Sequence, residues 1–129
     1  MREIMFTSKQ LKEVVKFTDP IMLIIQKEEE ILECYNNGTL KPPFLVEDNS
    51  QFLIFNGNHR VLVAINNKLN IKCKIIETDE DIALAQAEEG EGYRDLTNID
   101  PLTMENVLKE LRKSANMWSS QRPEDWVFE

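Results

Sequence analysis

One short segment constrains the fold more than any other: an apolar run, a glycine turn and a helix-like stretch. The run is Phe52-Leu53-Ile54-Phe55, the turn is Asn56-Gly57-Asn58-His59-Arg60, and the stretch is Val61-Leu62-Val63-Ala64-Ile65. A glycine turn between a buried strand and a helix start directs several backbone N–H groups outward, at the positive end of the helix dipole. Such a place favours a phosphate or another anion. The chain's only histidine and the adjacent arginine add donors and one titratable ring.

The length of 129 residues predicts one domain that can bury a core without disulfides or metals. We expect an α/β core with an N-terminal helix in residues 1–90, then a C-terminal helical extension and tail in residues 91–129. The apolar runs are far too short to span a bilayer, and no signal-peptide core follows Met1. Cys34 and Cys73 are therefore expected as buried thiols in a reducing cytoplasm.

The charge balance limits the classes of partner. The chain carries 15 Lys and Arg against 23 Asp and Glu, a net charge of −8. This argues against direct DNA binding, which depends on cations that displace counterions from phosphates. The stretch that begins at Glu77 and ends at Asp100 holds nine acidic residues and one basic residue, Arg94. It is interpreted either as a solvated face or as a docking surface for a basic protein partner.

Apolar periodicity and turn residues predict the elements. Helices are expected at residues 9–17, after a start at Thr7-Ser8, at 27–36, 58–67 and 82–89, and from Pro101 onward with Asp100 as cap. Strands are expected at residues 21–25, 44–46, 51–55 and 71–77. The last helix places a stripe of apolar residues at helical spacing, which predicts core packing: Met104, Val107, Leu108, Leu111, Ala115 and Trp118. This order predicts a small α/β domain with a mixed sheet and flanking helices.

Residues 52–76, FLIFNGNHRVLVAINNKLNIKCKII, resemble the ParB/sulfiredoxin fold superfamily: a strand, a glycine turn ending in arginine, an Ala-containing helix and another strand. Residues 31–43 are similar to the helix and Gly-x-x-x-Pro approach of ParB-like proteins, and residues 83–113 are similar in layout to their later segment. The resemblance implies that fold and a phosphate site from Gly57 to Arg60. Members bind or hydrolyse a nucleotide there, or transfer its phosphoryl group.

The chain also departs from these families. Asn58 stands where sulfiredoxin has its reactive cysteine, so sulfinic-acid repair is not expected. His59-Arg60 replaces two arginines of ParB, and Glu88-Glu89 lies near, without matching, the Glu-Asn pair that helps hold the nucleotide's metal in ParB.

Each residue of the turn has a functional and a structural interpretation. Arg60 either holds a phosphate as a bidentate fork or forms a salt bridge with a carboxylate. His59, the candidate catalytic residue, donates to a phosphate oxygen or shuttles a proton; the structural alternative is a capping hydrogen bond that orders the turn. Asn58 contacts phosphate or caps the helix, and Gly57 allows close backbone approach. From the resemblance, Lys27 and Arg94 are further candidate phosphate-binding cations, with solvent exposure as the alternative for Lys27.

Three functions follow as hypotheses. The first is a nucleotide-binding protein that uses ATP, ADP or CTP with Mg²⁺, as a phosphotransferase, an NTPase or a switch. The second is a non-catalytic acidic protein that inhibits a nucleic-acid-binding partner through the stretch from Glu77 to Asp100. The third is a ParB-like nuclease.

Overall fold

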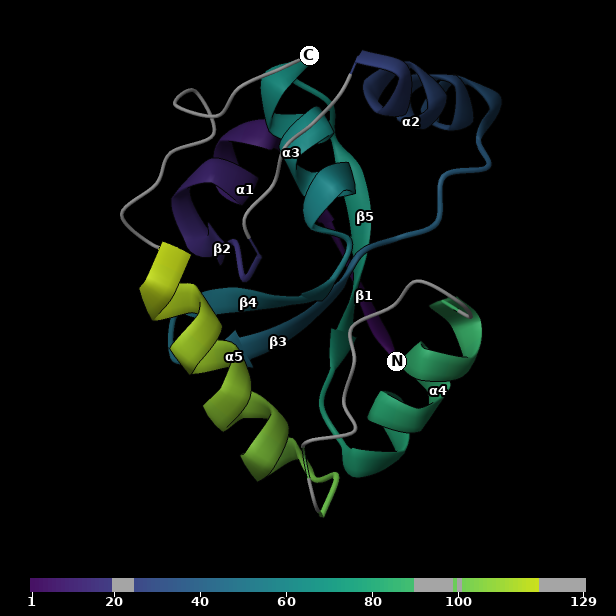
Figure 1. Ribbon diagram of the computed structural model, residues 1–129. Helices are drawn as coiled ribbons and strands as arrows, with labels where there is room; N and C mark the ends of the chain where they lie inside the picture. Colours follow the sequence, from purple (N-terminus) through teal and green to yellow (C-terminus); the bar gives the residue numbers. More distant parts are fainter. Residues whose placement is uncertain (20–24, 90–98, 100, 119–129) are drawn as a thin grey trace.

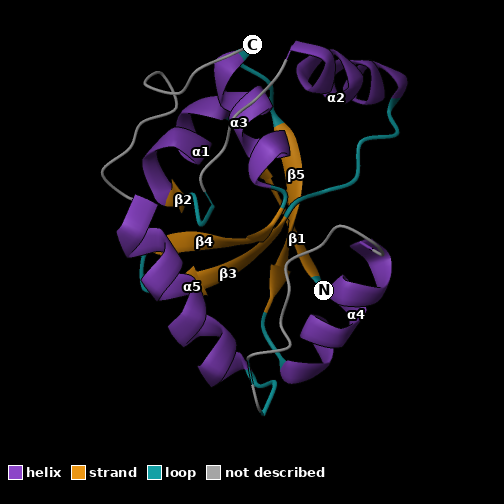
Figure 2. Cartoon of the chain, viewed as in Figure 1, coloured by secondary structure: helices purple, strands orange, loops and turns teal. Residues whose placement is uncertain are grey.

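The computed structural model describes residues 1–19, 25–89, 99 and 101–118, and within them it shows a mixed sheet with helices on both faces (Figures 1 and 2). The elements follow the order β1 (Arg2–Phe6), α1 (Ser8–Val14), β2 (Val15–Lys16), α2 (Ile25–Asn37), β3 (Phe44–Asp48), β4 (Gln51–Asn56), α3 (Asn58–Asn66), β5 (Ile71–Ile76), α4 (Asp79–Glu89) and α5 (Met104–Trp118). The predicted α/β class with a mixed sheet is therefore confirmed.

The sheet has the strand order β1-β5-β3-β4-β2. β3 and β4 form an antiparallel hairpin, β1 is antiparallel to β5, and the pairs β3–β5 and β2–β4 are parallel. The register aligns Phe44 with Asn56 on one side and with Lys74 on the other. The end of β4, the start of β3 and the middle of β5 therefore lie in one row across the sheet. The glycine turn begins at the β4 end of this row.

Successive residues of the central strands belong to two different apolar clusters, because side chains alternate between the faces of a sheet. Leu45, Ile54 and Ile75 pack in the cluster that contains Leu11 of α1 and Leu62 of α3. The other cluster joins strand residues to α4 and α5: Phe44, Val46, Leu53, Phe55, Ile76, Ile82, Ala85, Val107, Leu111 and Ala115. Burial on both faces explains why these strands read as continuous apolar runs.

Several predicted elements are confirmed. The strands at 44–46, 51–55 and 71–77 and the helices at 27–36, 58–67 and 82–89 match β3, β4, β5, α2, α3 and α4 within a few residues. The start at Thr7 is a capping box, in which the Thr7 hydroxyl accepts from the Gln10 N–H and the Gln10 side chain accepts from the Thr7 N–H. Val107, Leu111 and Ala115 are buried as expected.

Two predictions are corrected. The first helix ends at Val14, because Val15 and Lys16 pair with β4 as a short strand. The last helix begins at Met104, not at Pro101. Thr103 accepts from the Asn106 N–H at 3.3 Å, and Asp79 of α4 accepts from the Met104 N–H at 2.7 Å.

Two predictions fall partly outside the described residues. Of the strand expected at 21–25, residues 21–24 lie outside, and Ile25 begins α2 instead. The expected cap, Asp100, also lies outside the described residues.

Candidate functional site

The turn between β4 and α3 is built around Gly57. Gly57 is the N-cap of α3 with φ 107° and ψ 26°, a left-handed conformation that side chains rarely adopt. A Cβ at this position would stand 2.8 Å from the Cβ of Pro43 and 3.0 Å from its Cα. Glycine is therefore required both by the backbone conformation and by the contact with Pro43. The predicted glycine turn is confirmed.

The first turn of α3 begins with backbone N–H groups that the helix itself does not bond. Gly57 makes no side-chain capping hydrogen bond, and the Val61 N–H donates to the Gly57 carbonyl at 3.0 Å. The amides of Asn58, His59 and Arg60 precede this bond, so helix geometry gives them no partner within the helix. The positive end of the dipole lies at the same place.

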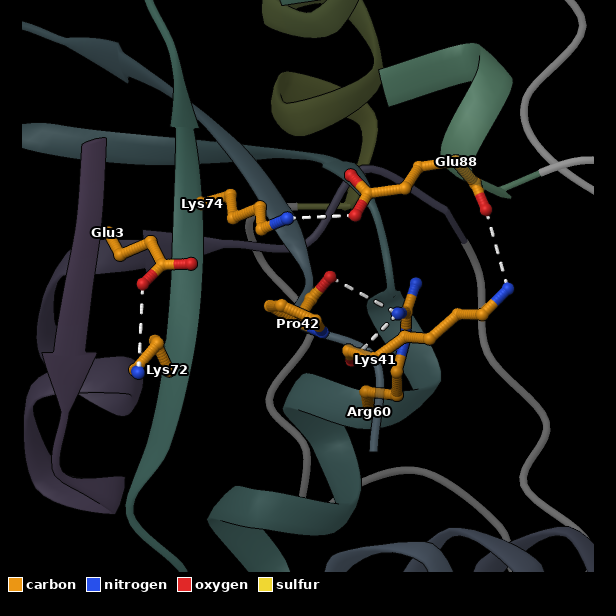
Figure 3. Close-up of polar contacts among 7 residues, drawn as sticks. All are labelled: Glu3, Lys41, Pro42, Arg60, Lys72, Lys74 and Glu88. Carbon is orange, nitrogen blue, oxygen red and sulfur yellow. Dashed lines mark hydrogen bonds and ion pairs between the residues drawn. The ribbon is translucent and has the colours of Figure 1, made fainter. Parts of the chain in front are cut away.

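Arg60 folds back over the turn. Its Nη1 donates to the carbonyls of Lys41 at 2.9 Å and Pro42 at 3.3 Å, and its Nη2 lies 3.0 Å from the position of a Cβ on Gly57 (Figure 3). The guanidinium therefore joins the loop before β3 to the start of α3. Both of these bonds are to main-chain carbonyls.

Asn58 is buried and its side chain serves the fold. Its Oδ1 accepts from the Thr18 N–H at 3.0 Å, and its Nδ2 donates to the Thr18 Oγ1 at 3.4 Å. The Thr18 hydroxyl in turn donates to the Ile54 carbonyl at 2.6 Å. The N-cap interpretation of Asn58 is wrong, since Gly57 holds that position. Thr18 had no signal in the sequence, because its partners are 36 and 40 residues away.

The other candidates are placed as follows. His59 lies half-buried in the first turn of α3, next to Arg60. Lys27 is exposed near the start of α2. Arg94 lies outside the described residues. The turn thus brings together the four consecutive candidates from Gly57 to Arg60.

Sequence reasoning missed two lysines that contact Glu88 of α4. Lys41 donates from Nζ to the Glu88 carbonyl at 3.3 Å, and the Lys74 Nζ lies 2.8 Å from the Glu88 Oε1 (Figure 3). The Lys74 ammonium also lies 6.0 Å from the centroid of the Phe44 ring. Lys74 alternates with the buried Cys73 and Ile75 along β5, but no neighbouring residue in the sequence indicates its partner Glu88.

The acidic stretch is partly used inside the fold. Asp81 accepts from the N–H groups of Glu77 at 2.8 Å and Thr78 at 3.1 Å, which caps the start of α4. Glu77 lies 3.7 Å from Arg2. Residues 90–98 and 100 of the stretch lie outside the described residues.

Both cysteines are free thiols. Cys73 is buried in β5, and burial raises its pKa to about 12, while the charge of Arg60 acts in the opposite direction. A thiol with this pKa stays protonated and is a poor nucleophile. Cys34 in α2 is half-buried rather than buried as expected. Among the described residues, no group of three or more His, Cys, Asp or Glu side chains is arranged to hold a metal ion.

No model of a known protein family, no curated protein and no solved structure matches the chain. Within the part of the chain that the structure describes, no helix is both long and apolar enough to cross a membrane.

Proposed function

We propose that this chain binds the phosphate groups of a nucleotide at the turn from Asn56 to Arg60. The observation that carries the proposal is the start of α3, where a left-handed glycine without a side-chain cap lies beside the Arg60 guanidinium. The backbone amides of a helix start, the positive end of the helix dipole and an adjacent cation together favour a phosphate group. The resemblance of residues 52–76 to ParB/sulfiredoxin-like proteins supports the same ligand class and points to ATP, ADP or CTP.

Each residue has a distinct role in this proposal. The amides of Asn58, His59 and Arg60 hold the phosphate oxygens, and Arg60 offsets their charge. Phosphoryl transfer or hydrolysis would rest on this positioning, with the His59 imidazole as the proton donor or acceptor. Lys27 and Arg94 are retained as further cations by the resemblance alone.

In this proposal Mg²⁺ is bound by the nucleotide and not by protein side chains. The described side chains beside the turn are mainly cationic, and the nearby Glu88 carboxylate is paired with Lys74. This donor set does not fit a protein-held Mg²⁺, which prefers oxygen ligands. The ion would be held by phosphate oxygens and water, and the chain's residues would contact the phosphates.

A nucleotide panel measured by thermal shift tests the proposal. ATP, ADP, CTP and GTP are added with and without Mg²⁺ to the native protein, to Arg60→Ala and to Arg112→Ala. A ligand at a hundred times its dissociation constant stabilises by about 2.7 kcal/mol, which raises the melting temperature by several degrees. We expect that rise in the native protein and in Arg112→Ala, and none in Arg60→Ala. No rise with any nucleotide would overturn the proposal.

A second candidate is an acidic docking protein, and one observation favours it. Glu80, Leu84 and Glu88 lie four residues apart along α4, and Leu84 is 56% exposed between the two carboxylates. An exposed apolar residue flanked by acids fits a basic partner. This candidate predicts salt-sensitive capture of a basic protein that Arg60→Ala leaves unchanged and Leu84→Ser with Glu80→Lys abolishes. The nucleotide proposal predicts neither result.

A further inference from the structure

The dipeptide Asn-Gly occurs twice in the chain, at Asn37-Gly38 and at Asn56-Gly57. The side-chain amide of an asparagine before glycine is attacked by the following main-chain nitrogen, because glycine has no side chain to shield that nitrogen. The sequence alone gives both dipeptides the same chemistry. The structure places them in very different surroundings.

Asn37 and Gly38 form the exposed end of α2, which lies at the periphery of the molecule (Figure 1). Gly38 adopts φ 72°, and a Cβ added there would have no heavy atom within 4 Å. The Gly38 N–H donates to the Tyr35 carbonyl at 3.2 Å, at the long end of the usual range for such a bond. The last turn of a helix opens readily. Small movements of this turn therefore bring the Gly38 nitrogen to the Asn37 side chain.

Asn56 and Gly57 are held in place from several directions. Asn56 is half-buried and pairs with Phe44 in the sheet. A Cβ added to Gly57 would stand 2.8 Å from Pro43, and the Gly57 carbonyl accepts from the Val61 N–H in the first turn of α3. Closing a succinimide ring here would require the backbone to rotate between the two residues. That rotation would disrupt the end of β4 and the start of α3 together.

We propose that Asn37 is a spontaneous deamidation site and that its products loosen the last turn of α2. The Gly38 nitrogen bonds to the Asn37 Cγ, the Cγ–Nδ2 bond breaks, and ammonia leaves with the proton of the Gly38 N–H. Water then opens the succinimide at either carbonyl and leaves an aspartate or an isoaspartate. Water is the only co-reactant, and the inference does not depend on the proposed function.

The products do not suit the end of this helix. Each adds a negative charge at the C-terminal end of α2, where the helix dipole is also negative and the last turn holds no basic residue. The Thr39 N–H donates to the Cys34 carbonyl at 2.9 Å and closes a loop that contains Asn37. Isoaspartate adds a methylene to the main chain inside that loop, so this hydrogen bond cannot keep its geometry.

Peptide mapping by mass spectrometry after incubation in mildly alkaline buffer tests the chemistry. The proteins are the native chain, Gly38→Ala and, as control, Asn36→Ala, which changes the exposed residue on the other side of Asn37. In the folded native protein we expect Asn37 to convert at least about tenfold faster than Asn56. Gly38→Ala should slow the conversion of Asn37, because a methyl group then shields the attacking nitrogen. Asn36→Ala should leave the rate unchanged.

Unfolding in urea separates the effect of the fold from that of the sequence. The two dipeptides should then convert at similar rates, because only their neighbouring residues still act. The inference is overturned if Asn56 converts as fast as Asn37 in the folded protein, or if the difference persists in urea. Earlier conversion at any other asparagine, such as Asn49 before Ser50, would also overturn it.

Hydrogen exchange measures the effect on α2. The amides of residues 35–39 should exchange faster in the converted protein than in fresh protein, because the hydrogen bonds of the last turn are weakened. Asn37→Asp adds the charge without lengthening the main chain, so it should show a smaller increase. Unchanged exchange at these amides in a fully converted sample would contradict the loosening.

Discussion

Gly57 lies so close to Pro43 that a methyl group at position 57 would stand 2.8 Å from the Pro43 Cβ. The contact fixes the loop before β3 against the start of α3, where Arg60 also bonds to that loop. The shape of the proposed phosphate site therefore depends on a residue without a side chain.

Gly57→Ala should destabilise the protein strongly. The positive φ alone costs about 1–3 kcal/mol for alanine, and the overlap with Pro43 adds about 1–3 kcal/mol. Gly38→Ala is the matched control, since Gly38 has φ 72° but nothing within 4 Å of an added Cβ. Urea unfolding should give a loss for Gly57→Ala at least about 1 kcal/mol larger than for Gly38→Ala. Equal losses in the free energy of unfolding would show that Pro43 moves away from the added methyl group without a loss of stability.

Asn58 and Thr18 should behave as one unit. Asn58→Ala leaves the buried Thr18 N–H without its acceptor, and Thr18→Val leaves the Ile54 carbonyl without its donor. Each change should cost about 1–3 kcal/mol. The double variant should lose less than the sum of the two, by about 0.5 kcal/mol or more. Additive losses would contradict the pairing, and Asn66→Ala, at an exposed position of α3, serves as the control.

Asp48 and Arg112 should make stability depend on pH. The hydrogen bonds from Arg112, at 2.8 and 3.1 Å, hold the pKa of Asp48 below its ordinary value. A carboxyl with a lowered pKa in the folded state contributes stability above its unfolded pKa, near 3.9, and loses it as the pH falls through the folded pKa. Arg112→Gln should therefore lower the free energy of unfolding at about pH 7. In strong acid Asp48 is protonated in both proteins, so the difference between the variant and the native protein should disappear. Lys113→Gln, which breaks an exposed pair within α5, should show a smaller change in urea unfolding.

The two thiols should differ in reactivity. Cys73 is fully buried with its pKa raised to about 12, whereas Cys34 is half-buried. With Ellman's reagent near the ordinary thiol pKa of about 8.5, Cys34 should react first and Cys73 only on unfolding. Cys34→Ser should abolish the fast phase. A fast phase that survives in Cys34→Ser would show that β5 opens readily.

Local chemistry in the sequence explains the elements that were predicted well. Asn49 adopts φ 59° in the turn between β3 and β4, and Gly38 adopts φ 72° after α2, as residues favoured in left-handed positions do. Strands β3 and β4 are buried on both faces, and their continuous apolar runs predicted them. These signals need only neighbouring residues.

Elements that depend on distant partners were missed. The segment Arg2–Phe6 is mostly exposed, and it forms β1 because its backbone pairs with β5. The start of α5 is set partly by Asp79, 25 residues earlier.

The same distinction divides the candidate site. The turn from Gly57 to Arg60 was visible because its residues are consecutive. Lys41 and Lys74 were not, because they meet Glu88 across 47 and 14 residues of chain. The burial of the Asn58 side chain could not be predicted either, because its partner Thr18 lies 40 residues earlier in the chain.

The pairing of β1 with β5 has a consequence for synthesis on the ribosome. The strand Arg2–Phe6 is synthesised before its neighbour Ile71–Ile76, which emerges roughly 65 residues later, after several seconds of translation. During that interval the nascent N-terminal segment has its backbone groups unsatisfied by any sheet. The adjacent charges of Arg2 and Glu3 favour hydration of this segment until β5 is made.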